Sequence, residues 1–156
     1  MNVTLRDIKE KLGTYKYLSH KQTIEFRKKW KKSFVKKNLK APMHRCSHCK
    51  GFVNDEAYGF DWHGISYAGF DNCHDYLNAI GKEAIFNKEE VVVFEEDCAQ
   101  KGIRILYSDI EKFLKKNKNK HYIDIYFTPK DFAWTVVLTH EDGYIGPFFV
   151  KAEMIK

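Results

Sequence analysis

Apolar side chains recur at helical spacing near the start of the chain. Leu5, Ile8 and Leu12 fall on one face of a short helix, because residues three and four apart in a helix lie above one another. Thr4 is placed to cap the first turn with its hydroxyl, and Gly13 is placed to end the helix. The pattern predicts one short helix with a single buried face.

A second, longer helix is predicted from about His20 to Lys37. Phe26, Trp30 and Phe34 repeat every fourth residue there and form an apolar stripe. The rest of its surface carries a run of cations: Arg27, Lys28, Lys29, Lys31, Lys32, Lys36 and Lys37. We interpret these cations as the solvated side of a core-packed helix. The same pattern could also follow nucleic-acid phosphates or lie on an anionic membrane.

The middle of the chain holds shorter elements. After a loop over 41–59, residues 60–67 read as a strand, and Asp71-Asn72 caps a third helix. Val91–Phe94 is a short apolar run that predicts a central strand. Ser108–Glu111 has the spacing of a capping box and predicts a fourth helix, whose lysine-rich end lies where the helix dipole favours cations.

The last third of the chain has the pattern of antiparallel strands. Residues 122–127 and 132–139 alternate with the period of half-buried strands, and Thr128–Asp131 turns between them. A second turn at Glu141–Gly143 leads to a returning strand over 148–150. We therefore expect a three-stranded antiparallel meander. The whole pattern predicts an α+β fold, with an antiparallel sheet of about five strands packed with about four helices.

Length and composition predict the organisation of the chain. The 156 residues are expected to form a single domain, 1–156, with a helical N-terminal part (1–40), a cysteine loop (41–59) and an α+β core (60–156). No apolar run suited to a signal peptide opens the sequence, and no segment approaches the roughly 20 apolar residues of a membrane span. A cytoplasmic protein is therefore expected. The formal net charge of +6 favours polyanions and acidic protein surfaces as partners.

Two cysteines with zinc-knuckle spacing are the most distinctive local motif. Cys46 and Cys49 flank Ser-His and precede Lys-Gly, a spacing by which one tight turn supplies two zinc ligands. A structural zinc takes four ligands, and the nearest candidates for the other two are Cys73 and His74. Adjacent side chains in a helix's first turn point in different directions, so the favoured set is the three cysteines with one histidine. The other candidate ligands are His44, His48 and His63.

Two other interpretations of the cysteines remain open. Cys46 and Cys49 could be free thiols in an exposed loop. A redox role is a third interpretation, although the pair does not follow a strand and open a helix as a thioredoxin-type motif does. Cys98 follows a predicted strand and is interpreted as a small buried residue.

A few histidines lie next to carboxylates and are candidates for acid–base chemistry. The candidate catalytic residues are His63, Asp124, His140 and Glu141, which would have to gather in one cleft. Asp142-Gly143 is equally an ordinary turn signal, and His63 can be a hydrogen-bonded core histidine. The sequence has no nucleophile elbow, phosphate loop or His-Glu-x-x-His helix, so a non-enzymatic function is favoured.

From Tyr58 onward, the order of motifs resembles a bacterial family known only as domain of unknown function 4275. The motifs that carry the resemblance are Gly59–Tyr67, Ile123–Tyr126, Asp131–Thr135, Thr139–Gly143 and Gly146–Phe149. The helix around Trp30 fits the usual beginning of this family. The resemblance implies a small cytoplasmic bacterial protein and implies no known activity or cofactor. The segment Cys46–Cys49 is an addition to the family pattern, so the resemblance does not support a metal.

Three functions are compatible with these observations. The favoured one is a non-enzymatic macromolecule-binding protein, such as a toxin-neutralising immunity protein, by analogy with small bacterial α+β proteins. The positive net charge then favours an acidic protein partner. The second is a zinc-stabilised nucleic-acid-binding protein that uses the basic helix Arg27–Lys37. The third is an enzyme that uses His63, His140 and nearby carboxylates.

Overall fold

The computed structural model describes residues 2–12, 14–34, 44–46, 51–53, 89–95, 100–117, 121–122, 124–138 and 148–151. Within these residues the chain forms three helices, which are α1 (Leu5–Lys11), α2 (His20–Phe34) and α6 (Tyr107–Lys116). The strands of the same residues are β1 (Asn2–Val3), β2 (Lys16–Tyr17), β3 (His44–Cys46), β4 (Gly51–Val53), β5 (Glu90–Glu95), β6 (Ile103–Leu106), β7 (His121–Tyr122), β8 (Ile125–Pro129), β9 (Trp134–Leu138) and β10 (Phe148–Lys151).

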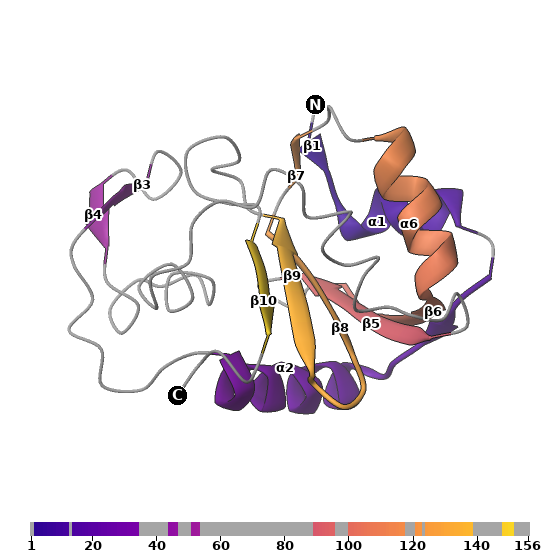
Figure 1. Ribbon diagram of the computed structural model, residues 1–156, viewed down its shortest axis with the longest axis horizontal. Coiled ribbons are helices and arrows are strands. Elements are labelled where there is room, and N and C mark those ends of the chain that lie inside the picture. The colour runs from indigo at the N-terminus through magenta and orange to yellow at the C-terminus, as the bar shows by residue number, and fades with distance from the viewer. Residues whose placement is uncertain are drawn as a thin grey trace.

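Six of these strands form one antiparallel sheet in the order β10-β9-β8-β5-β6-β2. Figure 1 labels the first five of them, from β10 to β6. Strand β2 is a two-residue edge strand, and the other five have four residues or more. Strand β5 is internal, and its Val93 pairs with Ile103 of β6 and Phe127 of β8. Two smaller pairs are β1 with β7, which is parallel, and β3 with β4, which is antiparallel.

Helices cover the sheet on both faces, with α2 on the opposite side from α1 and α6 (Figure 1). On the α1 and α6 side, apolar residues of both helices pack with one face of β5, β6, β8 and β9. The buried residues of this core are Val3, Leu5, Ile8, Val91, Val93, Ile103, Ile105, Tyr107, Ile110, Phe113, Leu114, Ile125, Phe127, Trp134, Val136 and Leu138. On the α2 side, Trp30 packs edge-on against Tyr126 with ring centroids 4.7 Å apart.

Strands β8 and β9 are buried on both faces, so the expectation of half-buried strands is wrong. All five residues of each strand are buried. Tyr126, which the alternation grouped with the polar positions, is fully buried beneath α2. Alternate residues along these strands therefore point to two faces that helices cover, and neither face is exposed to solvent.

The α+β class and the three-stranded meander β8-β9-β10 are confirmed. Strand β5 matches the predicted central strand, and α1 begins at the predicted cap. Helix α2 is described to Phe34, and the remaining residues of its predicted span lie outside the described part of the chain. The predicted strand over 60–67 and the predicted third helix also lie outside it.

Two local expectations need correction. The capping box at Ser108–Glu111 does not form, because α6 begins directly from β6 with Leu106 at the N-cap and no side-chain cap bond. The segment expected to be a cysteine loop contains the antiparallel pair β3 and β4. The predicted helical N-terminal part holds α1 and α2, together with the short strands β1 and β2, which pair with β7 and β6.

The N-terminus of α1 is fixed by a reciprocal capping box. The Asp7 amide donates to Thr4 Oγ1 at 3.3 Å, while the Thr4 amide and hydroxyl both donate to Asp7 Oδ2 at 2.8 Å. These hydrogen bonds favour the charged carboxylate, so the backbone bond from Thr4, followed by its hydroxyl bond, lowers the pKa of Asp7. The box fixes where α1 begins and how its buried face meets β5.

We expect Asp7→Asn to lower the free energy of unfolding at neutral pH. The folded pKa of Asp7 lies below the unfolded value of about 3.9, so its contribution is full above that value. The contribution disappears as the pH falls through the folded pKa. Urea unfolding at neutral pH and at about pH 2 measures this, with Glu10→Gln as an exposed control on the same helix. An equal deficit at both pH values would contradict the account.

Candidate functional site

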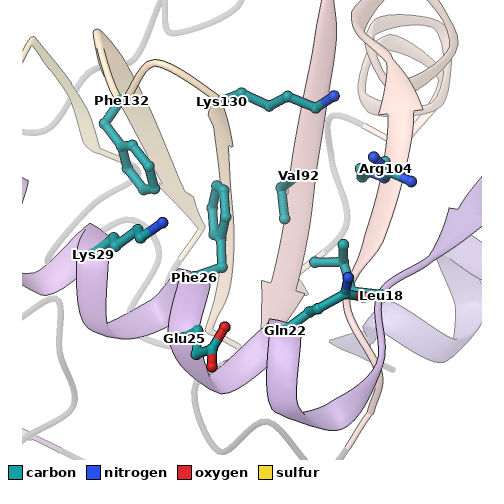
Figure 2. Close-up of a pocket in the computed structure, with 9 residues that line it drawn as sticks. All are labelled: Leu18, Gln22, Glu25, Phe26, Lys29, Val92, Arg104, Lys130 and Phe132. Carbon is teal, nitrogen blue, oxygen red and sulfur yellow. The ribbon is translucent and has the colours of Figure 1, made fainter.

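A hollow opens between α2 and the sheet, beside the first half of the helix (Figure 2). Its volume is about 290 Å³. We call it the α2 hollow, and its lining residues are Leu18, Gln22, Glu25, Phe26, Lys29, Val92, Arg104, Lys130 and Phe132. Helix α2 supplies one wall, strands β5 and β6 supply the floor, and the turn between β8 and β9 supplies the far wall (Figure 2).

The second half of α2 is anchored to the sheet by a buried indole. Trp30 is fully buried, and its Nε1–H donates to Thr135 Oγ1 on β9 at 2.8 Å. The Thr135 hydroxyl in turn donates to the carbonyl of Phe127 on β8 at 3.1 Å. Phe34, one turn later, is also fully buried. This end of the helix therefore lies directly on β8 and β9, and the sheet face beneath it is closed.

The start of α2 is attached to the loop before β6. Ser19 and Gln22 form a capping box, in which the Ser19 amide donates to Gln22 Oε1 at 2.9 Å and the Gln22 amide donates to Ser19 Oγ at 3.1 Å. The Gly102 amide donates to Thr23 Oγ1 at 3.0 Å, and Gly102 O accepts from the Leu18 amide at 2.8 Å. These hydrogen bonds fix the backbone of Gln22 and Leu18, whose side chains line the α2 hollow.

Gly102 allows this close approach because it has no side chain. A Cβ there would lie 3.2 Å from Leu18 Cδ1 and 3.2 Å from the Val93 carbonyl oxygen. Both distances are shorter than ordinary van der Waals contacts, and the carbonyl belongs to a central strand that cannot move freely. The absence of a side chain at position 102 therefore sets how closely α2 and β6 meet.

Two phenylalanines form the apolar wall of the hollow. Phe26 of α2 lies 4.6 Å from Phe132 between ring centroids and packs edge-on against Phe94 at 6.0 Å. Phe132 has a positive φ of 57° in the turn after β8, and its amide donates to the Pro129 carbonyl at 3.0 Å. The turn thus presents the ring to α2 instead of continuing the strand, and both rings remain partly exposed.

Three cations surround this aromatic wall. Lys29 comes from α2, Arg104 from β6 and Lys130 from the turn after β8 (Figure 2). The Lys130 Nζ lies 2.9 Å from Glu90 Oε1, a buried oxygen that accepts no well-directed hydrogen bond. Arg104 Nε is also buried, and no hydrogen-bond partner is present for it among the described residues. The hollow therefore combines an apolar wall with cationic hydrogen-bond donors.

Such a site is suited to binding an anion that carries an apolar group. Arginine presents several N–H donors in a rigid plane and matches the two oxygens of a carboxylate. Lysines at the rim add charge that attracts an anion without fixing its orientation. The rings of Phe26 and Phe132 can cover an apolar neighbour of that anion.

Only two of the predicted metal ligands, His44 and Cys46, lie in the described part of the chain. His44 and Cys46 begin and end β3, where their backbones pair with Val53 and Gly51 of β4. The other predicted ligands lie outside the described residues, namely Cys49, Cys73, His74, His48 and His63. Within the described part no group of three or more histidine, cysteine or carboxylate side chains gathers. The zinc site therefore stays a prediction.

Of the candidate catalytic residues, the described part of the chain includes Asp124. It is buried and has a positive φ of 26° just before β8. The α2 hollow meets β8 at its other end, beside Lys130, so Asp124 is not part of the hollow. His63, His140 and Glu141 lie outside the described residues, as does Cys98.

The sequence analysis singled out Phe26 and Lys29 of the α2 hollow but missed Arg104. The usable signal was its position in Ile103–Leu106, where a charged residue sits between two isoleucines in an apolar strand. Charges in such positions are often paired or functional. The predicted solvated side of α2 is confirmed, because the side chains of Lys28, Lys29, Lys31 and Lys32 are exposed. Among the described helices, none has the length and apolarity to cross a membrane.

The bond between Trp30 and Thr135 gives a direct test of how α2 is held. Thr135→Val leaves the buried indole N–H without an acceptor, which should lower the free energy of unfolding by about 1–3 kcal/mol. In the Trp30→Phe background the same substitution should cost less, because no donor is then left unpaired. Urea unfolding of the two single variants and the double variant measures the coupling.

Thr128→Val is the matched control, since its hydroxyl donates to the Trp134 carbonyl instead of receiving the indole. Its effect should add to that of Trp30→Phe. Equal coupling of both threonines to Trp30, or no coupling of Thr135, would show that the indole bond does not hold α2 in place.

Comparison with known proteins identifies a family and no activity. The family described as "Domain of unknown function (DUF4275)" matches residues 5–149, which include α1, α2, the α2 hollow and the meander as far as the start of β10. No curated protein and no solved structure shows significant similarity to the chain. Because the match covers nearly the whole sequence, the chain belongs to the DUF4275 family.

Proposed function

We propose that this chain is a non-enzymatic binding protein whose partner is another protein with an acidic surface. The observation that supports this most is the α2 hollow, where three cations surround an open aromatic wall. The hollow adjoins the polar side of α2, whose exposed lysines extend the cationic surface along the helix. These exposed lysines are Lys21, Lys28, Lys29, Lys31 and Lys32.

The composition of the hollow favours a protein over a nucleic acid as partner. Aromatic residues and arginine are enriched where proteins bind one another, and Phe26, Phe132 and Arg104 supply both. Glu25 in the lining and Glu90 beside Lys130 would repel the closely spaced phosphates of a nucleic acid. An acidic side chain on a protein is a single charge with apolar neighbours, which matches this mixed lining better.

The net charge of +6 fits the same kind of partner. Complementary charge accelerates encounter between proteins, and association should weaken as salt screens the lysines. Within this class, our concrete proposal is an immunity-type protein that neutralises an acidic cognate toxin in the cytoplasm. It rests on analogy with other small bacterial proteins, and binding of an acidic protein is its first requirement.

Charge reversal on α2 tests the proposal. Lys28→Glu with Lys32→Glu reverses two exposed lysines one turn apart on α2 and leaves the lining of the α2 hollow intact. The tagged wild type should capture a specific acidic protein from extracts of its native cell, identified by mass spectrometry. The double reversal should weaken binding of that purified protein by about tenfold or more, because each lost attraction becomes a repulsion.

The matched control is Lys112→Glu with Lys116→Glu, two exposed lysines at the same spacing on α6, on the other side of the sheet. It changes net charge equally and should leave the affinity within about twofold. Equal loss in both double variants would show that only total charge matters. Captured material that nuclease treatment releases would replace the proposal with the nucleic-acid alternative.

A further inference from the structure

Arg104 occupies a position that the rest of its strand does not explain. In β6, Ile103 and Ile105 point into the core shared with α1 and α6. Arg104 between them lies on the opposite face of the sheet, paired with Val92 of β5 on one side and Lys16 of β2 on the other. An apolar residue would suit this half-buried position beside Val92, and the arginine therefore calls for a separate reason.

One nitrogen of the Arg104 guanidinium lacks a hydrogen-bond acceptor among the residues that the structure describes. This nitrogen is Nε, and it is buried. The nearby carboxylate of Glu90 instead forms an ion pair with Lys130. A buried donor without an acceptor destabilises the folded protein, and proteins retain such groups mainly where function uses them.

We propose that Arg104 receives a carboxylate from the partner protein, carried by an acidic side chain that lies next to an aromatic or aliphatic one. The carboxylate oxygens accept from the terminal N–H groups of the guanidinium, because Nε itself is buried while Arg104 as a whole is half-buried. The neighbouring apolar side chain packs on Phe26 and Phe132, whose ring centroids are 4.6 Å apart. The inference rests on the proposed function in one respect, namely that the carboxylate belongs to a partner protein.

The charge balance of the hollow favours one carboxylate over a phosphate group. Lys29, Arg104 and Lys130 carry three positive charges, against one negative charge on Glu25 in the lining and one on Glu90, which is paired with Lys130. One positive charge is left uncompensated, which a single carboxylate neutralises. A phosphate monoester carries up to two negative charges at neutral pH and would leave an excess beside two glutamates.

The size of the hollow sets a limit on its occupant. Its volume of about 290 Å³ is at the lower end of the range for small-molecule pockets. That space suits one or two side chains and is too small for a bulky cofactor. A short segment that inserts an acidic residue and one apolar neighbour, while the remainder stays on the lysine face of α2, fits both features.

The experiment uses the full chain and three probes: acetyl-Phe-Glu-amide, acetyl-Phe-Gln-amide and inorganic phosphate. The Nε–Hε resonance of Arg104 in ¹⁵N-correlated NMR spectra reports directly on the group that the proposal names. The glutamate peptide should shift this resonance and the amide resonances of Phe26 and Phe132 in a saturable way. The glutamine peptide, which matches it in size and lacks the charge, should bind at least about tenfold more weakly.

Substitutions separate binding from folding. Arg104→Lys keeps the charge and removes the planar set of donors, so it should weaken the glutamate peptide by about tenfold. Lys29→Gln at the rim should weaken it by a few-fold, and Lys112→Gln on α6 should have no effect. Arg104→Met should retain or raise the midpoint of thermal unfolding while abolishing peptide binding, because it removes an unpartnered buried donor.

Each outcome bears on the proposal. Equal binding of the glutamate and glutamine peptides, or unchanged binding in Arg104→Lys, would overturn it. Phosphate that shifts the Arg104 resonance at lower concentration than the glutamate peptide would reassign the hollow to phosphate. Peptide binding that depends on Arg104, without capture of an acidic protein, would support the carboxylate site and contradict only the proposed partner class.

Discussion

The architecture depends on a single buried indole that joins a cationic helix to the sheet. Trp30 is fully buried, donates to Thr135 on β9 and packs edge-on against Tyr126 on β8. Both strands are already buried on their other face by α1 and α6. A sheet covered on one face only would expose Tyr126 and Phe94, so the position of α2 decides whether the second core exists.

The same placement explains why a hollow lies beside the helix. Trp30 and Phe34 close the sheet face over β8 and β9. The first half of α2 is held near β5 and β6 by the hydrogen bond from Gly102 to Thr23 and by the packing of Phe26 on Phe94. The space between these two attachments holds Phe26, Arg104 and the lysines at the rim. The attachment of α2 to the sheet and the cationic lining of the hollow thus have one cause. The helix covers β8 and β9 closely and leaves space above β5 and β6.

What the sequence reveals depends on the range of the interactions involved. The cap at Thr4, the stripe through Trp30 and the meander follow from local spacing, and all three are confirmed. The burial of β8 on both faces was not predictable from its alternation, because α2 is distant in sequence and covers the side expected to face solvent. Arg104 was missed for the same reason, since its environment comes from α2 and the turn after β8.

Hydrogen exchange at the indole of Trp30 tests the central claim that α2 is an integral layer of the fold. If the helix is clamped as described, Trp30 Nε1–H exchanges only through global unfolding, at the free energy shared by the slowest amides of β5. Exchange of the indole orders of magnitude faster than those amides would show that α2 opens independently. The hollow that gives Arg104 its environment would then be transient, and the account of the binding site would fail.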